Sequence, residues 1–239
     1  WSALGDGIGG GSVNFLAAEG SNLYAGGNFS SAGGVSAGLV AKWDGATWSA
    51  VGSGMHSSSP NPGVEALAVI GTDVYARGNF DSAGGVPVNY LAKWNGVTWS
   101  ALGTGVNGLV TSLSATSTSL YVSGGFTIAG GISAHYHAKW DGSSWSPMDK
   151  SGVGMSDIVR VLVSSGSDLY AGGEFLTAGG VRVNRVAKWN GGTWDPLGSG
   201  TNGAVYTLAA SGSDLYAGGQ FDSAGGIRAR NIARWDGNR

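Results

Sequence analysis

The chain contains no cysteine, few charged residues and little histidine, and the first two of these shortages exclude whole classes of function. Without cysteine there are no disulfide bonds and no thiolate metal sites. Charged residues make up 12% of the 239 residues and the formal net charge is −2, so the strongly basic composition of many nucleic-acid-binding proteins is absent. No apolar run approaches the roughly 20 residues needed to cross a membrane. The sequence therefore predicts neither a nucleic-acid partner nor a membrane span.

The residues that usually perform catalysis form no recognisable pattern. Asp44, Asp141 and Asp236 each precede a glycine, as turn residues do. No G-x-S-x-G nucleophile motif occurs, and no helix is expected after the Gly-Gly segments, as a phosphate-binding loop would require. His135 and His137 would share one face of a strand, but no third metal ligand is evident. We expect a protein that is not an enzyme and that binds no metal and no cofactor.

The most informative feature that is present is a set of ten tryptophans in five pairs. Four pairs lie within the chain and read W-[DN]-G-x-x-W, whereas the fifth pair is split between the two ends of the chain. The pairs are Trp43/Trp48, Trp94/Trp99, Trp140/Trp145, Trp189/Trp194 and Trp235/Trp1. A repeat that starts at the C-terminus and is completed at the N-terminus predicts a closed ring.

The spacing of the pairs divides the chain into five repeats with nothing left over. Cutting before the second tryptophan of each pair gives residues 1–47, 48–98, 99–144, 145–193 and 194–239. Repeats of roughly 40–50 residues are typical of four-stranded propeller blades. Each repeat holds four short segments bounded by Gly, Asp and Ser, with no helical period: V-x-x-L, [LV]-Y-x-x-G, a segment ending in A-[KR]-W, and W-x-x-[LVM]. A long loop centred on A-G-G-[VI] joins the second and third segments.

These patterns predict an all-β protein with a single domain over residues 1–239, a five-bladed β-propeller with four antiparallel strands per blade. Trp1–Gly5 is expected to close the ring as the last strand of the C-terminal blade. The expected blades cover approximately residues 12–53, 63–104, 109–149, 158–199, and 204–239 plus 1–6.

The tryptophan pair can be placed on the hairpin between the third and fourth strands. A two-residue loop at Asp44-Gly45 would put Trp43 opposite Ala46, and a four-residue loop would put it directly opposite Trp48. Either loop leaves both rings on one face of the hairpin, because an even loop preserves the face. The tryptophans recur inside the strand frame of every repeat, so packing between blades is favoured over stacking on a ligand.

The repeat L-Y-A-G-G-x-F-x-x-A-G-G-V, followed by A-K-W-D-G-x-x-W-S-A-L-G-x-G, resembles the WDG-type (delta-60-like) β-propeller repeats of large bacterial surface and secreted proteins. The resemblance covers the whole chain. Its Y-x-x-G-G portion is also similar to kelch repeats, in which the tryptophans are spaced differently. By blade count the architecture is similar to the tachylectin-type five-bladed lectins, which bind amino sugars at sites repeated around the ring. These resemblances imply a propeller and leave the ligand open.

Candidate ligand contacts lie on the face that carries the long loops and the blade-to-blade connections, where the repeats differ in length. One set precedes the Phe of G-x-F or follows the A-G-G-[VI] loop: Asn28, Asn79, Glu174, Gln220, Asn89, His135, Asn184 and Arg230. A second set is the second position of each first strand, expected to surround the mouth of the central channel: Asn14, Glu65, Thr111, Arg160 and Tyr206. Amide side chains in loops also cap backbone groups, so capping is the competing explanation for the first set.

The sequence favours a non-catalytic binding module, lectin-like and carbohydrate-binding, with shallow repeated sites on the long-loop face. Several weak sites on one rigid ring would gain avidity against a repetitive polymer. The alternative is a structural or protein-interaction propeller of a bacterial surface, secreted or filament protein. The Gly-rich, cysteine-free composition favours an exported bacterial protein, secreted or at the cell surface. The start at Trp1 is expected to mean either that a leader has been removed or that the chain is a segment of a longer protein. The expected partner is a glycan or a surface protein, and the ring is expected to be monomeric.

Overall fold

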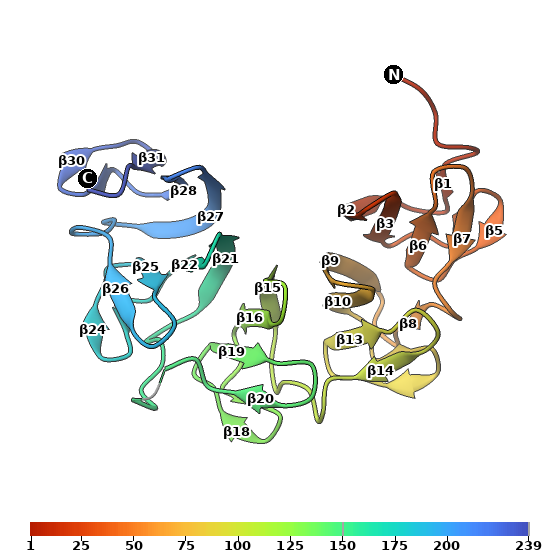
Figure 1. Ribbon diagram of the computed structural model, residues 1–239, viewed down its shortest axis with the longest axis horizontal. Coiled ribbons are helices and arrows are strands. Elements are labelled where there is room, and N and C mark those ends of the chain that lie inside the picture. The colour runs from red at the N-terminus through yellow and green to blue at the C-terminus, as the bar shows by residue number, and fades with distance from the viewer. Residues whose placement is uncertain (150, 239) are drawn as a thin grey trace. The chain divides into compact units, whose positions relative to one another are not determined.

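The computed structural model describes residues 1–149 and 151–238, and every regular element in that part of the chain is a β-strand (Figure 1). Residue 239, which ends the last expected blade, lies outside the described residues. The chain forms two compact units, Trp1–Val106 and Asn107–Arg239. The described residues include no helix that is long and apolar enough to cross a membrane. The all-β prediction is confirmed.

The first unit (Trp1–Val106) holds two four-stranded antiparallel sheets whose spatial order follows the chain order. Neighbouring strands are therefore joined as hairpins or by the long loop. The first sheet consists of β2 (Val13–Glu19), β3 (Asn22–Gly27), β6 (Val40–Trp43) and β7 (Trp48–Ala50). The second sheet consists of β9 (Gly63–Ile70), β10 (Asp73–Asn79), β13 (Leu91–Trp94) and β14 (Trp99–Ala101).

The second unit (Asn107–Arg239) repeats this pattern twice and then departs from it. The third sheet consists of β15 (Val110–Ala115), β16 (Leu120–Gly124), β19 (His137–Trp140) and β20 (Trp145–Ser146). The fourth sheet consists of β21 (Val159–Ser165), β22 (Asp168–Gly173), β25 (Val186–Trp189) and β26 (Trp194–Pro196). The fifth sheet has three strands, β27 (Ala204–Ser211), β28 (Asp214–Gln220) and β31 (Ile232–Trp235).

Each long loop contains a small hairpin of two-residue strands. The two central residues of each hairpin are glycines with positive φ, for example 56° at Gly33 and 78° at Gly34 in the first sheet. Positive φ at both central residues is characteristic of a type I′ turn. The hairpins are β4 (Ser31–Ala32) with β5 (Val35–Ser36), β11 (Ser82–Ala83) with β12 (Val86–Pro87), β17 (Ile128–Ala129) with β18 (Ile132–Ser133), β23 (Thr177–Ala178) with β24 (Val181–Arg182), and β29 (Ser223–Ala224) with β30 (Ile227–Arg228). In the first unit, β1 (Ile8–Gly9) pairs with β4 and β8 (Met55–His56) pairs with β11, so the chain entering a sheet lies beside a long loop.

The two tryptophans of each internal pair lie directly opposite each other on neighbouring strands. Of the two hairpin loops considered from the sequence, the four-residue loop is therefore the one that forms. Trp43 is the register partner of Trp48, and the same holds for the other three internal pairs. Ring centroids in these pairs are 5.3–5.5 Å apart with tilted planes. Asp44 holds the turn, because its Oδ1 accepts hydrogen bonds from the backbone amides of Ala46 and Thr47, and these bonds lower the pKa of its carboxyl.

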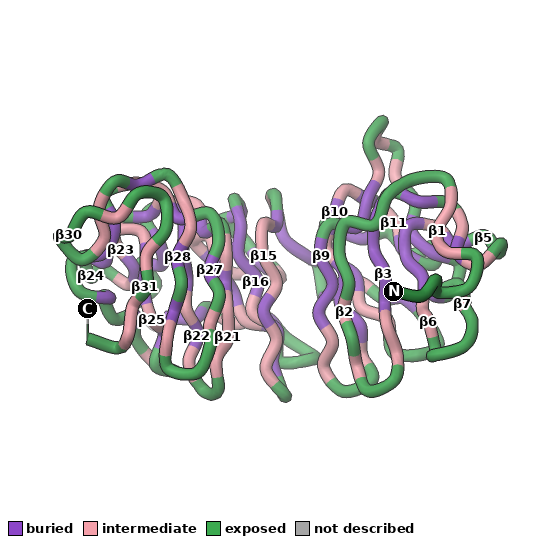
Figure 2. Tube along the Cα trace, turned by 90° about the horizontal axis from the view of Figure 1, so that it is seen from above, coloured by how far each residue is buried: buried purple, intermediate pink, exposed green. Residues whose placement is uncertain are grey.

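Within each unit, the first strand of a sheet packs closely against the second strand of the sheet before it. A Cβ added at Gly26 would lie 2.4 Å from Cγ1 of Val64, and one at Gly172 would lie 2.6 Å from Cγ1 of Val205. Glycine is therefore needed at both positions for the next sheet to approach. The result is a core of buried aliphatic and aromatic side chains between sheets. Figure 2 colours the buried residues purple along the backbone trace.

Three of the recurring lysines of A-[KR]-W lie over tyrosine rings, as expected for side chains that run along the sheet surface. The Nζ atoms of Lys42, Lys93 and Lys188 are 6.0, 5.8 and 5.8 Å from the ring centroids of Tyr24, Tyr75 and Tyr170. Lys93 and Lys188 also pair with Asp73 and Asp168, at 2.6 and 2.7 Å. The pKa of both lysines is raised, first by these hydrogen bonds.

Candidate functional site

A β-bulge in the first strand of every sheet positions the residues expected at the channel mouth. In the first sheet the register runs from Val13 opposite Gly27 to Phe15 opposite Gly26, so the residue between them has no partner in the ladder. The other four sheets show the same shift near the start of this strand. A bulge redirects one side chain and ends regular pairing, which is why bulges are common beside binding sites. The bulged residues are Asn14, Glu65, Thr111, Arg160 and Tyr206.

Two of the five bulged residues brace neighbouring sheets. Asn14 Nδ2 donates to the carbonyl oxygen of Val64 at 3.2 Å, and Thr111 Oγ1 donates to the carbonyl oxygen of Val159. In both cases the acceptor immediately precedes the bulged residue of the next sheet in the same unit. These side chains hold one innermost strand against the next.

The other three bulged residues pair with a side chain near the end of the second strand. Arg160 Nε donates to Glu174 Oε1 at 2.9 Å, and Tyr206 Oη donates to Gln220 Oε1 at 3.1 Å. Glu65 forms an ion pair with Arg77 in the first unit. Glu174 and Gln220 belong to the loop set and Arg160 and Tyr206 to the mouth set, so the structure brings two predicted sets together.

These two pairs form the candidate binding site. They occupy equivalent positions in the fourth and fifth sheets, whose first strands β21 and β27 pack against each other through Val161, Val205 and neighbouring aliphatic residues. The side chains are open to solvent: Arg160 is 40% exposed, Glu174 38% and Tyr206 49%. The arrangement offers a guanidinium, a carboxylate, an amide and an exposed aromatic ring on one surface.

Five of the six remaining loop candidates hydrogen-bond to their own or adjoining loops. Asn28 Oδ1 accepts from the backbone amide of Ser12 at 2.7 Å, and Asn79 Nδ2 donates to the carbonyl oxygen of Asn61 at 2.7 Å. Asn89 and Asn184 donate to the carbonyl oxygens of Thr104 and Ser199, at 3.1 and 2.8 Å. His135 contacts the hydroxyl of Ser133, and Arg230 is exposed in the loop before β31. These hydrogen bonds are of the loop-capping kind that the sequence analysis gave as the alternative to ligand binding.

Three further loop residues cap the small hairpins and were not predicted from the sequence. Asn107 Oδ1 accepts from the backbone amides of Thr127 and Ile128, both at 2.9 Å, and Asn202 Oδ1 does the same for Asp222 and Ser223. Ser156 Oγ takes this place for the fourth sheet. The only sequence signal was a small polar residue recurring in the connection before each of these sheets.

His137 is a core residue and is separate from His135. It starts β19, is 1% exposed, and its Nε2 accepts a hydrogen bond from Trp194 Nε1 at 3.2 Å. An indole nitrogen only donates, so Nε2 carries no proton and Nδ1 donates to the carbonyl oxygen of His135. Burial lowers the pKa of His137, which keeps the ring neutral although Asp149 lies 3.9 Å from Nε2. Because His135 precedes β19, the expectation that the two histidines share a strand face is wrong.

No family model and no curated protein matches this chain. Solved structures do. The computationally designed Ika8 protein is 16% identical with a TM-score of 0.59, over 96% of this chain and 59% of that one. The extracellular domain of the hybrid two-component system BT4673 from B. thetaiotaomicron is 11% identical with a TM-score of 0.51, over 89% of this chain and 26% of that one. The chain thus spans less than two thirds of either protein, and at this identity the likeness shows the all-β fold alone.

Proposed function

We propose that the five sheets are the blades of a five-bladed β-propeller of the WDG-repeat type, closed by Trp1–Gly5, and that the protein is a non-catalytic carbohydrate-binding module, secreted or at the cell surface. Burial differences support the ring. Val13 and Leu16 of the first sheet are 40% and 55% exposed, whereas their counterparts Val64 and Leu67 are 0% and 4% exposed. Ile232 on the fifth sheet is 68% exposed. The first and last sheets thus each leave open a face that neighbours cover elsewhere.

The observation that carries the binding proposal is the pair of bulges that present Arg160 with Glu174 and Tyr206 with Gln220. A sugar ring has an apolar face that stacks on an aromatic ring and vicinal hydroxyls that need both donors and acceptors. Tyr206 supplies the ring, while the guanidinium, carboxylate and amide supply fixed donors and acceptors. Each pair already holds its members in place, so little side-chain freedom is lost on binding.

The site proposed here is composite rather than five-fold. The bulged residue differs in every sheet, and Asn14 and Thr111 are occupied as braces between sheets. Binding is therefore expected to be weak per site and shallow. Avidity against a repetitive polymer would come from several molecules or from adjacent repeats of the ligand.

A glycan array followed by titration calorimetry tests this proposal. Tyr206→Ala is expected to weaken binding to the selected sugar about tenfold or more, because an aromatic contact of about 1.5 kcal/mol is lost. Tyr90→Ala, which removes a tyrosine that is 40% exposed in the first unit, is the matched control and should leave affinity unchanged. The proposal fails if no glycan binds at millimolar concentration, or if both variants bind like the unmodified protein.

A structural or protein-interaction propeller of a bacterial surface, secreted or filament protein is the second candidate. It is favoured by the loop amides of Asn28, Asn79, Asn89 and Asn184, which bond within the protein. Such loops present a fixed shape to a partner protein. Failure of the glycan screen would leave this candidate in place.

A further inference from the structure

A pocket of about 270 Å³ lies between the third and fourth sheets, inside the second unit. One wall is a row of register partners on neighbouring strands of the third sheet, Tyr121, Lys139 and Ser146. The fourth sheet and the connection that leads to it supply the other lining residues: Pro147, Met148, Trp189, Gly191 and Gly192. The pocket is next to the tryptophan hairpins, at the other end of the strands from the bulges.

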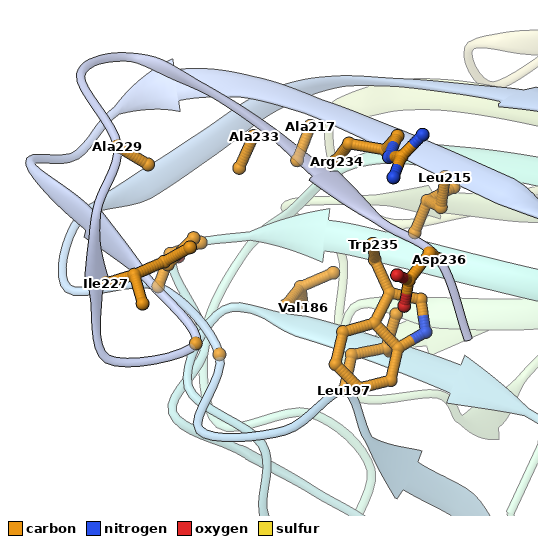
Figure 3. A pocket seen from close by; sticks show the side chains of 14 residues that line it. Val186, Leu197, Leu215, Ala217, Ile227, Ala229, Ala233, Arg234, Trp235 and Asp236 are labelled. Atoms are coloured by element: carbon orange, nitrogen blue, oxygen red, sulfur yellow. The ribbon is translucent and has the colours of Figure 1, made fainter. Parts of the chain in front are cut away.

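A larger pocket, of about 460 Å³, lies along β31 of the fifth sheet and differs in origin (Figure 3). It is lined mainly by apolar side chains, with Val186 and Leu197 facing Ala217 and Ala233. The fifth sheet has three strands where the other four sheets have four. The larger pocket is therefore the edge of a sheet, whereas the smaller one is enclosed by two complete sheets.

The lysine in the smaller pocket lacks the partner that its counterparts have. In the other sheets the cation at this position is held by the protein, as Lys42 over the Tyr24 ring, Lys93 with Asp73, Lys188 with Asp168 and Arg234 with Asp214. The third sheet has Ser119 at the position of these aspartates. Within the described part of the chain, Lys139 makes no ion pair and no cation–π contact. Its ammonium group is available to a ligand.

The two hydroxyl groups in the same row are available as well. In the first two sheets the serine equivalent to Ser146 donates to a lysine carbonyl oxygen, Ser49 to Lys42 and Ser100 to Lys93, both at 3.4 Å. Neither Ser146 Oγ nor Tyr121 Oη makes a hydrogen bond to another described residue. One wall thus offers an ammonium group, which only donates, and two hydroxyl groups. A carboxylate, which only accepts, is the complementary group.

The opposite wall leaves room because Gly192 has no side chain. The corresponding turn positions of the first three sheets hold Ala46, Val97 and Ser143. The φ of Gly192 is not positive, and a Cβ there would meet only Asn190 Oδ1, 3.9 Å away. Neither backbone conformation nor crowding therefore requires a glycine at this position. Its effect is to open a space beside the apolar surface of Trp189 and Met148.

We propose that this pocket binds a small organic carboxylate with a flat apolar body. The carboxylate accepts hydrogen bonds from the ammonium group of Lys139 and from the hydroxyl groups of Tyr121 and Ser146, and the body lies against Trp189 and Met148. The volume corresponds to about nine water molecules at roughly 30 Å³ each, which suits an aromatic acid of about nine non-hydrogen atoms such as benzoate. The site is separate from the sugar site, and the proposal does not rest on it.

Titration of the full chain with sodium benzoate, followed by NMR of the labelled protein, tests the site. The indole N–H of Trp189 and the amides of Gly191 and Gly192 are expected to shift with a dissociation constant of about 1 mM, a usual value for a ligand of this size. Lys139→Met should bind about tenfold more weakly or worse, because the charged donor is lost. Lys42→Met, the matched variant in the first sheet, should bind benzoate like the unmodified protein. Signals that do not move at benzoate concentrations well above about 1 mM, or equal affinity in Lys139→Met, would overturn the proposal.

Ser119→Asp tests the role of the free lysine without removing it. The new carboxylate supplies the partner that Asp73, Asp168 and Asp214 provide in other sheets, so benzoate binding should weaken about fivefold or more. Unchanged affinity in this variant would show that Lys139 does not hold the ligand.

Two further ligands and one variant define the specificity of the site. Benzamide, which has no charge, should bind about tenfold more weakly than benzoate or worse. Acetate that binds as well as benzoate would overturn the part of the apolar body. Tyr206→Ala should leave benzoate binding unchanged, and a protein that binds benzoate but no glycan keeps this site and loses the sugar proposal.

Discussion

Replacing Trp1 by alanine is expected to lower the free energy of unfolding by about 3–5 kcal/mol, the usual cost of removing a buried tryptophan. The reason is that, in the ring proposed above, Trp1 completes the fifth tryptophan pair and is buried as its counterparts Trp99 and Trp194 are. For a chain of this length the loss corresponds to a drop in the melting temperature on the order of 10 °C. Urea denaturation followed by circular dichroism measures it.

Two further variants make this result specific. Trp1→Phe should lose less stability than Trp1→Ala, because the ring is kept and only the indole donor is lost. Val97→Ala, at a position that is 78% exposed in the turn between β13 and β14, should change stability by less than about 0.5 kcal/mol. If Trp1→Ala behaves like Val97→Ala, Trp1 remains in solvent and the ring is not closed by this segment.

Replacing Trp194 by alanine is expected to cost a similar amount, about 3–5 kcal/mol, in the middle of the second unit. Trp194 is 1% exposed and stacks beside Trp189 with ring centroids 5.3 Å apart. It also donates the hydrogen bond that satisfies Nε2 of the buried His137. Its removal leaves a cavity and an acceptor without its partner.

Trp194→Phe separates these two contributions. The ring still fills most of the space, so the expected loss is the smaller cost of about 1–3 kcal/mol for a buried polar atom left unsatisfied. The loss should shrink further in a Trp194→Phe, His137→Val double variant, because Val40 and Val186 occupy the position of His137 in the first and fourth sheets. Equal losses for Trp194→Ala and Trp194→Phe would show that the hydrogen bond, rather than packing, dominates.

The strands and the tryptophan pairs could be predicted from the sequence because their signals are strong and repeated. Each strand has an alternating or aromatic pattern between glycines, and W-[DN]-G-x-x-W fixes a hairpin. The sequence left two hairpin registers open, and the hydrogen bonds of Asp44 to Ala46 and Thr47 account for the four-residue loop that forms.

The small hairpins and the bulges could not be predicted in the same way. A two-residue strand such as Val35–Ser36 is too short to show alternation, and its pairing depends on the positive φ of Gly33 and Gly34. The bulge at Arg160 adds one residue to a strand whose letters look regular. The sequence therefore identified Arg160 and Glu174 as candidates, but their pairing emerged only from the structure.

His137 shows how context overrides residue type. From the sequence it was one of two histidines expected to share a strand face, with no third metal ligand evident beside them. In the structure it occupies the position that Val40, Leu91 and Val186 hold in other sheets. Its unprotonated Nε2 accepts a hydrogen bond from the indole of Trp194. A buried polar residue with a dedicated partner is a packing element.

Amide hydrogen exchange at Arg234 tests whether a fourth strand closes the fifth sheet. In the complete sheets the amide of Asp44 donates to the carbonyl oxygen of Thr47, so the next hydrogen-bonded pair of the ladder is Lys42 with Ser49. Arg234 is the counterpart of Lys42. In the ring proposed above, its amide therefore donates to the carbonyl oxygen of Ser2. If the sheet is closed, the amide of Arg234 is expected to exchange as slowly as those of Lys42, Lys93, Lys139 and Lys188. Exchange of Arg234 at the rate of an unprotected amide, with the four lysines protected, would contradict closure of the sheet.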